Sequence, residues 1–518
     1  MVPDPRQDDT PKVRTLPRRA WLAGAAALGA SAAAAQAPQT AEGPVPAPAA
    51  AGARRLPADK TTQHALELPD GRALRFSATA GSFLLPDPQG APDAEFAFIA
   101  YRLDAAEART RPVAFVLNGG PGASSAWLHL GALGPWRLPI GGDPPSPSAP
   151  PNLVANAETW LGFTDLVFLD PVGTGYSGLL ASGDAARRRY WSVGGDLRSI
   201  AEAIRRWLDA NGRGASPKLL VGESYGGFRA PRLARTLAQD HGIGVGGLVL
   251  LSPALDMGGG GPASEPLRWA VRLPTMAAAA RAARGEAADG PSAEAERYAL
   301  AEYLPDLLRG ERDAAAVARL VAGVAALTGL DPDFVRRRHG RIETDDFLRE
   351  LGRASGRTAS PYDAAVRGPD PFPLAPAGDN PDPILDTLAA PLTGAMLGLY
   401  ADRLDWRPEG RRYEVLNRAV NREWEWGRDG GRPEAVTALR TALAFDVRLR
   451  VLVAHGLFDL VTPYFATKLL LDQIPDSAGA DRLRSVVHPG GHMFYSRDAS
   501  RAALRDEAQA LFRTVAEP

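Results

Sequence analysis

After residue 112 the chain becomes a series of short, nearly continuous apolar runs that alternate with stretches of helical spacing. Strands that are apolar at every position are buried on both faces, as in a mostly parallel sheet covered by helices. Residues 196–212 and 226–242 lie between such runs, have helical spacing and end at glycine, a common helix terminus. We therefore predict an α/β fold with a mostly parallel central sheet and helices on both faces. The expected strands are residues 113–118, 166–170, 218–222, 248–252, 449–454 and 483–487.

Residues 63–103 alternate apolar and polar positions and are broken by turn residues such as Asp70-Gly71. This alternation is typical of antiparallel strands joined by turns. We assign the segment, together with the apolar runs that follow it, to a first part of the core at residues 63–256.

Residues 257–440 interrupt the α/β pattern. The interruption opens on a run of four glycines, contains helical stretches at 296–310 and 313–327, and holds a loop dense in proline. Sheet-like residues return there only at 413–416. We expect a largely helical cap insertion over the carboxyl edge of the sheet, followed by the second part of the core at residues 441–518.

The N-terminus has the order of a secretory signal. A twin-arginine pair at 18–19 precedes an apolar run and the small-x-small residues 35–37, which predicts a twin-arginine-type signal peptide at residues 1–37. The run is too short and too rich in alanine and glycine for a good membrane span; the alternative is a buried core helix. Pro38 is a poor residue just after a cut, so the cleavage site stays open. Residues 38–62 are rich in proline and alanine and predict a linker, and we expect a periplasmic or secreted protein.

Charge and cysteine content exclude several classes of function. The 59 basic and 60 acidic residues nearly cancel, which argues against a nucleic-acid partner or a membrane surface. The chain has no cysteine, so thiolate chemistry, disulfides and cysteine-ligated metals are excluded. We find no H-E-x-x-H motif and expect neither metal nor cofactor. The oligomeric state remains open.

A candidate nucleophile lies in Gly222-Glu223-Ser224-Tyr225-Gly226, between an expected strand and an expected helix. This matches the G-x-S-x-G elbow, a strained turn in which glycines avoid clashes with the neighbouring strand and helix. In a chain so rich in glycine the match alone is weak, and its strand–turn–helix context strengthens it. Reactive groups of open α/β sheets collect in such loops, after the carboxyl ends of the strands.

A nucleophilic serine needs a base and a group that orients the base. The fold predicts the chain order serine, then aspartate or glutamate, then histidine. Asp459 and His492 follow the last two expected strands in that order, so we predict Ser224, Asp459 and His492 as the catalytic triad.

Three other polar residues also end strands. His488 is the competitor for the base, but it lies very close to the strand end. We interpret His455 as structural, because it precedes a glycine at the end of its strand. Asp170 precedes the serine in sequence and lies in a Pro-Val-Gly-Thr-Gly turn, so we expect it to shape a loop.

The oxyanion hole of such a site combines the N–H after the nucleophile with one from an earlier strand-end loop. The candidates are Tyr225 N–H and Gly120 N–H, the latter in the loop 117–125. The alternative for this loop is a simple Gly-Pro turn.

Five separated motifs resemble the serine carboxypeptidase family (peptidase family S10) over about residues 112–256 and 440–500. They are LNGGPGASS, FLDPVGTGYS, GESYGG, HGLFD followed by TP, and GGHM, in this order. The resemblance implies an α/β-hydrolase fold with a cap, the same triad and oxyanion hole, and removal of C-terminal residues from peptides with a free C-terminus. It also implies that Glu223 pairs with Asn118, assisted by the backbone of Gly119, to hold the terminal carboxylate of the substrate. Two adjacent carboxylates share a proton, so binding is expected to favour acidic pH.

The chain departs from the family at two positions. Ala123 stands where members usually carry cysteine, consistent with a cysteine-free bacterial exported branch. Ala132 stands where many members carry a glutamate that joins the carboxylate network, which weakens the expectation of strict carboxypeptidase specificity. Two alternatives follow: an esterase or acyltransferase with the same triad, and a non-catalytic binding protein on a hydrolase fold.

Overall fold

The computed structural model describes residues 55–104, 106–141, 146–257, 265–374, 381–427 and 433–517. The expected signal peptide lies outside these ranges. At the described end of the expected linker, the N–H groups of Arg55 and Leu56 donate to Glu95 Oε1, at 3.0 and 3.1 Å. The chain is therefore already packed against the core before the first strand begins at Lys60.

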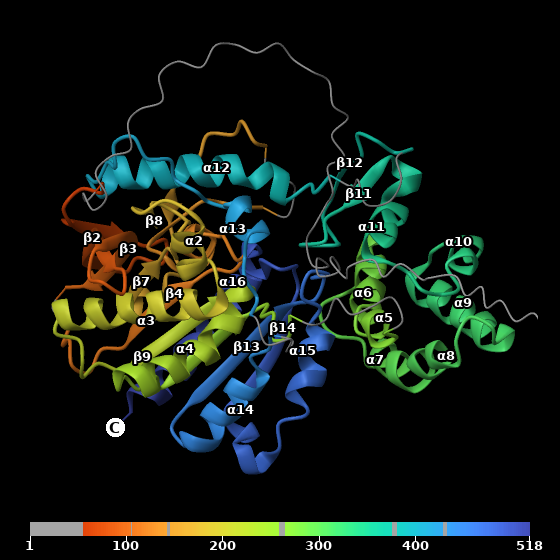
Figure 1. The fold of residues 1–518 in the computed structure, drawn as a ribbon. Helices are drawn as coiled ribbons and strands as arrows, with labels where there is room; N and C mark the ends of the chain where they lie inside the picture. Colours follow the sequence, from red (N-terminus) through yellow and green to blue (C-terminus); the bar gives the residue numbers. More distant parts are fainter. Residues whose placement is uncertain are drawn as a thin grey trace, which may run out of the picture.

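The main sheet has ten strands within the described residues (Figure 1), in the order β1-β2-β3-β7-β4-β9-β10-β13-β14, with β8 paired to β3. The strands β4, β7, β9, β10, β13 and β14 pair in parallel, as predicted. Every residue of β4, β7 and β10 is buried, which explains their continuous apolar sequences. These strands are β4 (Val113–Leu117), β7 (Asp165–Leu169), β8 (Gly178–Leu179), β9 (Lys218–Glu223), β10 (Gly247–Leu251), β13 (Arg450–Gly456) and β14 (Leu483–His488).

The N-terminal edge of the sheet is antiparallel, also as predicted. It consists of β1 (Lys60–Glu67), β2 (Ala73–Pro86) and β3 (Pro92–Leu103). The edge strand β1 alternates between exposed and partly buried residues, whereas β3 is almost entirely buried. The alternation in β1 therefore reflects a sheet edge that faces solvent on one side, whereas β3 lies inside the sheet.

Helices cover both faces of the sheet, and successive residues of β4 show the division. Val113, Phe115 and Leu117 pack in one core with α3 (Val193–Ala210), α4 (Tyr225–His241) and α14 (Val436–Phe445). Ala114 and Val116 pack in a second core with α16 (Asp498–Ala516) and α12 (Leu385–Gly398). The period-two alternation of a strand thus assigns neighbouring residues to opposite helical layers.

The region between β10 and α14 is largely helical. Its first part forms a lobe beside the sheet (Figure 1, right), with a third hydrophobic core that also includes Phe458 and Tyr464 of the segment after β13. The lobe contains α5 (Leu267–Ala270), α6 (Leu273–Ala283), α7 (Ala293–Tyr298), α8 (Leu304–Arg309), α9 (Ala314–Thr328), α10 (Pro332–Arg337) and α11 (Thr344–Gly352).

Two details of this region differ from the sequence pattern. A short hairpin, β11 (Arg357–Ala359) and β12 (Arg367–Pro369), was not expected. Residues 413–416 form no strand; they make single bridges, Glu414 with Gly175 and Leu416 with Ala123. They look sheet-like because they pair with two core loops and lie beside buried residues, although no strand continues there.

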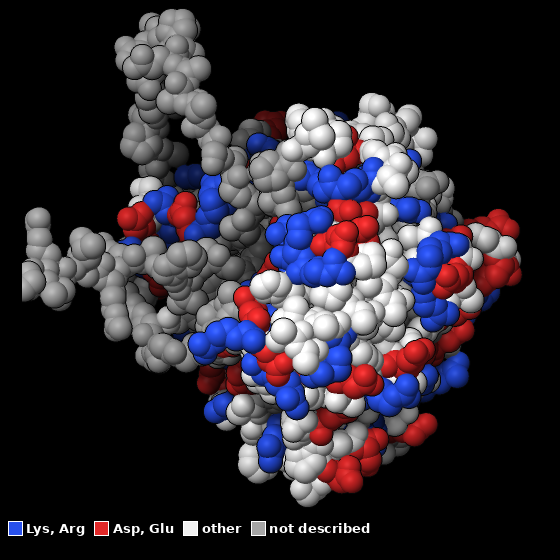
Figure 2. Space-filling model, turned by 90° about the vertical axis from the view of Figure 1, so that its right-hand side faces the viewer, with Lys and Arg blue, Asp and Glu red and all other residues white. Residues whose placement is uncertain are grey.

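Charged residues on the lobe side of the molecule are of mixed sign (Figure 2). Ion pairs such as Arg319–Asp306 and Arg338–Asp346 bring the two signs together. The remaining described helices are α1 (Ala126–Leu128), α2 (Asp184–Tyr190), α13 (Arg418–Arg422) and α15 (Tyr464–Leu471), and β5 (Trp136–Arg137) pairs with β6 (Val154–Ala155).

Candidate active site

Ser224 lies on a sharp turn between β9, which ends at Glu223, and α4, which begins at Tyr225. Its backbone has φ 59° and ψ −122°, a region that costs free energy for a residue with a side chain. The flanking glycines make the turn possible. A Cβ at Gly222 would lie 2.1 Å from Gly226 O, and one at Gly226 would lie 2.5 Å from Leu117 O.

Asp459 and His492 lie side by side after β13 and β14. His492 Nδ1 is 2.7 Å from Asp459 Oδ2, and both side chains are buried. The other carboxylate oxygen, Oδ1, accepts the N–H groups of Val461 and Thr462 at 2.8 and 3.0 Å. An ionised aspartate only accepts hydrogen bonds, so Nδ1 carries the proton and Nε2 is free to act as a base.

The segment after β10 connects this pair to the turn of Ser224. The N–H of Ser224 donates to Leu251 O, and Ala254 N–H donates to Ser224 O, both at 3.0 Å. From the same segment, the hydroxyl of Ser252 donates to His492 O at 2.9 Å. Within the described residues the Ser224 hydroxyl itself makes no hydrogen bond; in unliganded enzymes catalytic hydrogen bonds are commonly long and shorten with substrate.

The acidic groups around His492 stabilise its protonated form. Burial lowers the pKa of His492, but the charge and hydrogen bond of Asp459, together with the charge of Glu223, raise it, and the net pKa lies above the ordinary value. The acidic groups thus stabilise an imidazolium, which is the state that a general base reaches after it takes a proton.

The expected oxyanion donors also lie at this turn. A Cβ at Gly119 would lie 2.6 Å from Tyr225 N and 2.7 Å from Ser224 Cβ, so the loop after β4 packs directly against the nucleophile turn. Gly120 adopts φ +100°, which favours glycine. Tyr225 is the first residue of α4, where N–H groups have no partner within the helix and the dipole favours negative charge.

Arg229, on α4, holds the loop in this position and was not anticipated from the sequence. Its buried guanidinium donates to Asn118 O and pairs with Asp196 of α3, with Nε 2.6 Å from Oδ2. An arginine on an otherwise apolar helix face indicates a buried polar contact, because its guanidinium needs a partner. The sequence does not identify that partner, because it lies far away along the chain.

Glu223 is buried beside the triad and is hydrogen-bonded through both oxygens. Asn118 Nδ2 donates to Oε2, and the hydroxyl of Tyr495 donates to Oε1 at 2.9 Å. Burial raises the pKa of Glu223 to about 7, opposed by the charge of His492 and by these donors. The expected pairing of Glu223 with Asn118 is therefore present, and Glu223 titrates near neutral pH. Tyr495 was not among the predicted site residues.

A segment of the inserted region, Pro361–Ala364, contacts the loops of both Asp459 and His492. Tyr362 O accepts the N–H of His492 at 2.5 Å, and its ring lies edge-on to the imidazole. Pro361 O accepts Leu460 N–H, and Ala364 N–H donates to Phe458 O, each at 3.0 Å. We call this segment the strap. The sequence indicated only a proline-dense loop here, because backbone contacts leave no signal in side-chain pattern.

The other polar strand-end residues are not part of the Asp459–His492 pair. His488 Nε2 lies 3.2 Å from Glu507 Oε2 of α16, and so belongs to a different contact. His455 is buried, and burial lowers its pKa to about 4, so it is neutral. Asp170 accepts the N–H and the hydroxyl of Ser125 at 2.8 Å each, in the loop that follows Gly120. It thus shapes a loop, as expected.

The comparisons with known proteins agree with this fold. The chain resembles the crystal structure of a prohormone-processing carboxypeptidase from Saccharomyces cerevisiae, with TM-score 0.51 and 15% identity, covering 84% of this chain and 91% of that one. Together with the elbow between β9 and α4, this identifies an α/β-hydrolase fold, as predicted.

Sequence comparisons point to one family within that fold. Residues 92–252 match the sequence model of the serine carboxypeptidase family. "Serine carboxypeptidase-like 29" of Arabidopsis thaliana is 30% identical over 138 residues, which is 26% of each chain. The pheromone-processing carboxypeptidase KEX1 of Phaeosphaeria nodorum is 32% identical over 127 residues, 23% of this chain and 17% of that one. The serine carboxypeptidase family is thus supported for the segment that includes Asn118 and Ser224; the matches span about a quarter or less of these relatives.

Proposed function

We propose that the chain is a serine carboxypeptidase that hydrolyses peptides from the C-terminus through an acyl-enzyme. The observation that carries the proposal is the position of Glu223: a buried carboxyl group that titrates near neutral pH, directly before Ser224 and paired with Asn118. A serine hydrolase needs no such group for acyl transfer, but recognition of a second carboxylate does.

In the proposed reaction Ser224 Oγ attacks the last peptide carbonyl, and His492 Nε2 takes the hydroxyl proton. The N–H groups of Gly120 and Tyr225 stabilise the oxyanion. His492 then gives the proton to the nitrogen of the departing C-terminal amino acid, which leaves an ester on Ser224. Water hydrolyses this ester with His492 again as the base, while Asp459 keeps Nδ1 protonated and oriented.

Recognition of the chain end in this proposal requires a protonated Glu223. Its O–H donates to the substrate carboxylate, assisted by Asn118 and by the backbone of Gly119, because two neighbouring carboxylates cannot both stay ionised. Glu223 loses this proton as the pH rises through its pKa, which burial raises to about 7. KM for free-acid peptides should therefore rise above that pH, which supports a preference for acidic to neutral conditions.

A matched pair of substrates, one peptide acid and its C-terminal amide, tests the proposal across about pH 4 to 8. We expect kcat/KM for the acid to exceed that for the amide at acidic pH, with the preference falling as Glu223 ionises. In Glu223→Gln a neutral donor persists at every pH, so the profile should flatten while ester turnover remains. Equal values for acid and amide at acidic pH would contradict carboxylate recognition and favour the esterase or acyltransferase alternative.

We also propose that the protein is exported as the twin-arginine-type signal indicates, and that it belongs to a bacterial exported branch, although the relatives compared are from a plant and a fungus. Among the described residues no helix is long and apolar enough to cross a membrane. Replacement of Arg18 and Arg19 by lysine should leave the full-length protein in the cytoplasm; unchanged export would contradict the assignment.

A further inference from the structure

The Glu223 network includes a donor from the last part of the chain. Tyr495 is fully buried in the short turn after His492, and its hydroxyl donates to Glu223 Oε1 at 2.9 Å. Its ring packs against Gly131, where an added Cβ would lie 2.7 Å from Tyr495 Cε2. Gly131 adjoins Ala132, whose methyl group offers no donor or acceptor. The phenol of Tyr495 therefore supplies a polar contact to Glu223 from beside the position that Ala132 leaves apolar.

We propose that Tyr495 is a positioning residue for recognition of the substrate's terminal carboxylate, and that it acts by holding Glu223 Oε1 and directing the Glu223 proton to Oε2. This inference rests on the proposed function. A phenol can donate to Oε1 whether or not Glu223 is protonated, so Oε1 is occupied in both states. With the Tyr495 donor on Oε1, the shared proton is placed on Oε2, which keeps a lone pair for the N–H of Asn118 Nδ2. There the O–H and the amide of Asn118 face one carboxylate together.

The charged and titratable groups around Glu223 come from several elements. The charge of His492, in the loop after β14, lowers the pKa of Glu223, and the charge of Asp459, in the loop after β13, raises it. The charge of Glu223 in turn raises the pKa of Tyr362 in the strap. Tyr495 differs from these groups because it makes a direct hydrogen bond to the carboxyl oxygen. A donor to a carboxylate stabilises the ionised form, so Tyr495 lowers the pKa of Glu223 against the effect of burial.

The test is the variant Tyr495→Phe, which removes the hydroxyl and keeps the ring against Gly131. Without this donor the ionised form of Glu223 is less stable, so its pKa rises. The pH at which the acid-over-amide preference is half lost should therefore move upward by about one pH unit. At pH values below both midpoints the preference should fall several-fold, because Oε2 is no longer the favoured proton site.

Two further variants separate positioning from a structural role. Tyr464→Phe is the matched control: Tyr464 is also buried and its hydroxyl lies 3.1 Å from a glutamate, Glu296 of α7, so it should leave the midpoint unchanged. In the Glu223→Gln background, Tyr495→Phe should cause no further change in the pH profile, because the two residues act through one contact.

The outcomes distinguish this inference from the proposed function. An unmoved or lowered midpoint in Tyr495→Phe, or equal loss of acid and amide turnover without a shift, would overturn the role of Tyr495. Absence of any acid-over-amide preference in the unmodified protein would instead overturn the carboxypeptidase proposal itself.

Discussion

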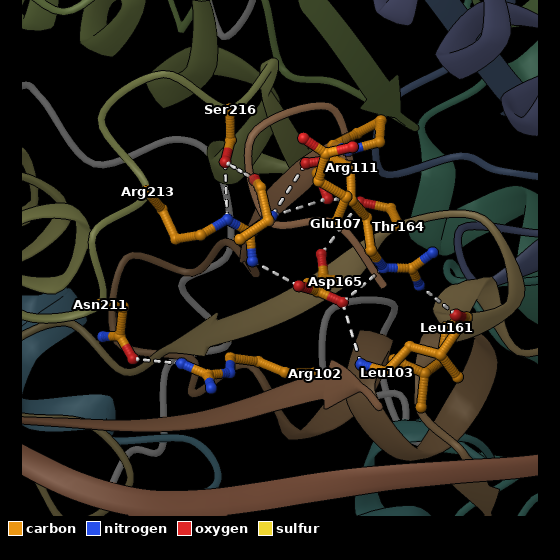
Figure 3. Close-up of polar contacts among 12 residues, drawn as sticks. Arg102, Leu103, Glu107, Arg111, Leu161, Thr164, Asp165, Asn211, Arg213 and Ser216 are labelled. Atoms are coloured by element: carbon orange, nitrogen blue, oxygen red, sulfur yellow. Dashed lines mark hydrogen bonds and ion pairs between the residues drawn. The ribbon is translucent and has the colours of Figure 1, made fainter. Parts of the chain in front are cut away.

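Two buried carboxylates at opposite ends of the parallel strands differ in their surroundings. Asp165, the first residue of β7, lies between two arginines (Figure 3): Arg111 Nε is 2.6 Å from Oδ1, and Arg213 Nη1 contacts Oδ2. Leu103 N–H donates to Oδ1 as well, at 3.1 Å. Glu223, the last residue of β9, receives only an amide and a phenol through direct contacts.

This difference separates a structural carboxylate from a titrating one. The network around Asp165 joins β3, β7 and the loops before β4 and β9, so it ties the amino ends of β4, β7 and β9 to the carboxyl end of β3. Among the described residues no cation is bonded directly to Glu223, and burial raises its pKa to about 7. A buried charge without an opposite charge costs free energy, and proteins retain such a group mainly where it has a task.

The largest effect should come from Ser224 at the carboxyl ends, with the buried Ser216 at the amino ends as its comparison. Ser224→Ala should lower kcat by about a million-fold and abolish labelling by a fluorophosphonate, because the acyl-enzyme cannot form. Ser216→Ala removes a buried hydroxyl that accepts Arg213 Nε at 2.6 Å, and it should lower the melting temperature while leaving kcat unchanged. Substantial turnover by Ser224→Ala would refute the triad.

At the amino ends, Asp165→Asn leaves two arginines without their common anion. We expect the free energy of unfolding to fall by about 3–5 kcal/mol, with kcat of the folded protein unchanged. The control is Asp70→Asn, which removes an aspartate from a solvent-exposed pair with Arg72 and should lower the free energy of unfolding far less than Asp165→Asn does. Equal effects of the two variants in urea denaturation would contradict the contrast between the two ends.

At the carboxyl ends, Glu223→Gln should change the free energy of unfolding in the opposite direction from Asp165→Asn. The pKa of Glu223 is about 7 in the folded protein, against an ordinary value of 4.5, so the folded state holds the proton more tightly. Stability is then lost as the pH rises from about 4.5 to 7, by at most about 3 kcal/mol. Near pH 8 the variant should unfold at a higher denaturant concentration than the unmodified protein, and near pH 4 the two should agree. A variant less stable at pH 8 would show that Glu223 is compensated like Asp165.

Displacement of the strap should lower activity, because the strap contacts the catalytic loops at the carboxyl ends of the strands. A Cβ at Gly491 would lie 1.9 Å from Tyr362 O, so Gly491→Ala should displace the strap and the histidine loop and lower kcat by about 100-fold. Gly214 lies between α3 and β9, with no atom within 4 Å of an added Cβ, and Gly214→Ala should be neutral. Full activity of Gly491→Ala would show that the strap does not position His492.

The smallest effect should be that of chelators, which we expect to leave activity unchanged. The described residues contain no group of three or more histidine, aspartate or glutamate side chains that could hold a metal ion. Activity measured with and without EDTA should be equal. Loss of activity that zinc restores would contradict the serine mechanism.

Local patterns in the sequence were enough to predict the strands and the nucleophile turn on which the site is built. Continuous apolar runs are required of strands buried on both faces, and such runs predicted the parallel strands. The elbow at Ser224 was predictable because a tight strand–turn–helix connection needs glycine at 222 and 226, where any Cβ would clash with backbone. The order of Ser224, Asp459 and His492 followed from the positions of the strands, and the structure joins the last two directly.

Only the tertiary structure decided which distant groups complete each carboxylate's surroundings. Tyr495 reaches Glu223 across 272 positions of the chain, and Arg213 reaches Asp165 across 48. The strap acts through backbone carbonyl and N–H groups, which every residue has, so no residue type marks it. Both carboxylates follow or begin an apolar run in the sequence and look alike there. Their different behaviour arises from burial and from the charge of neighbours that the fold alone brings near.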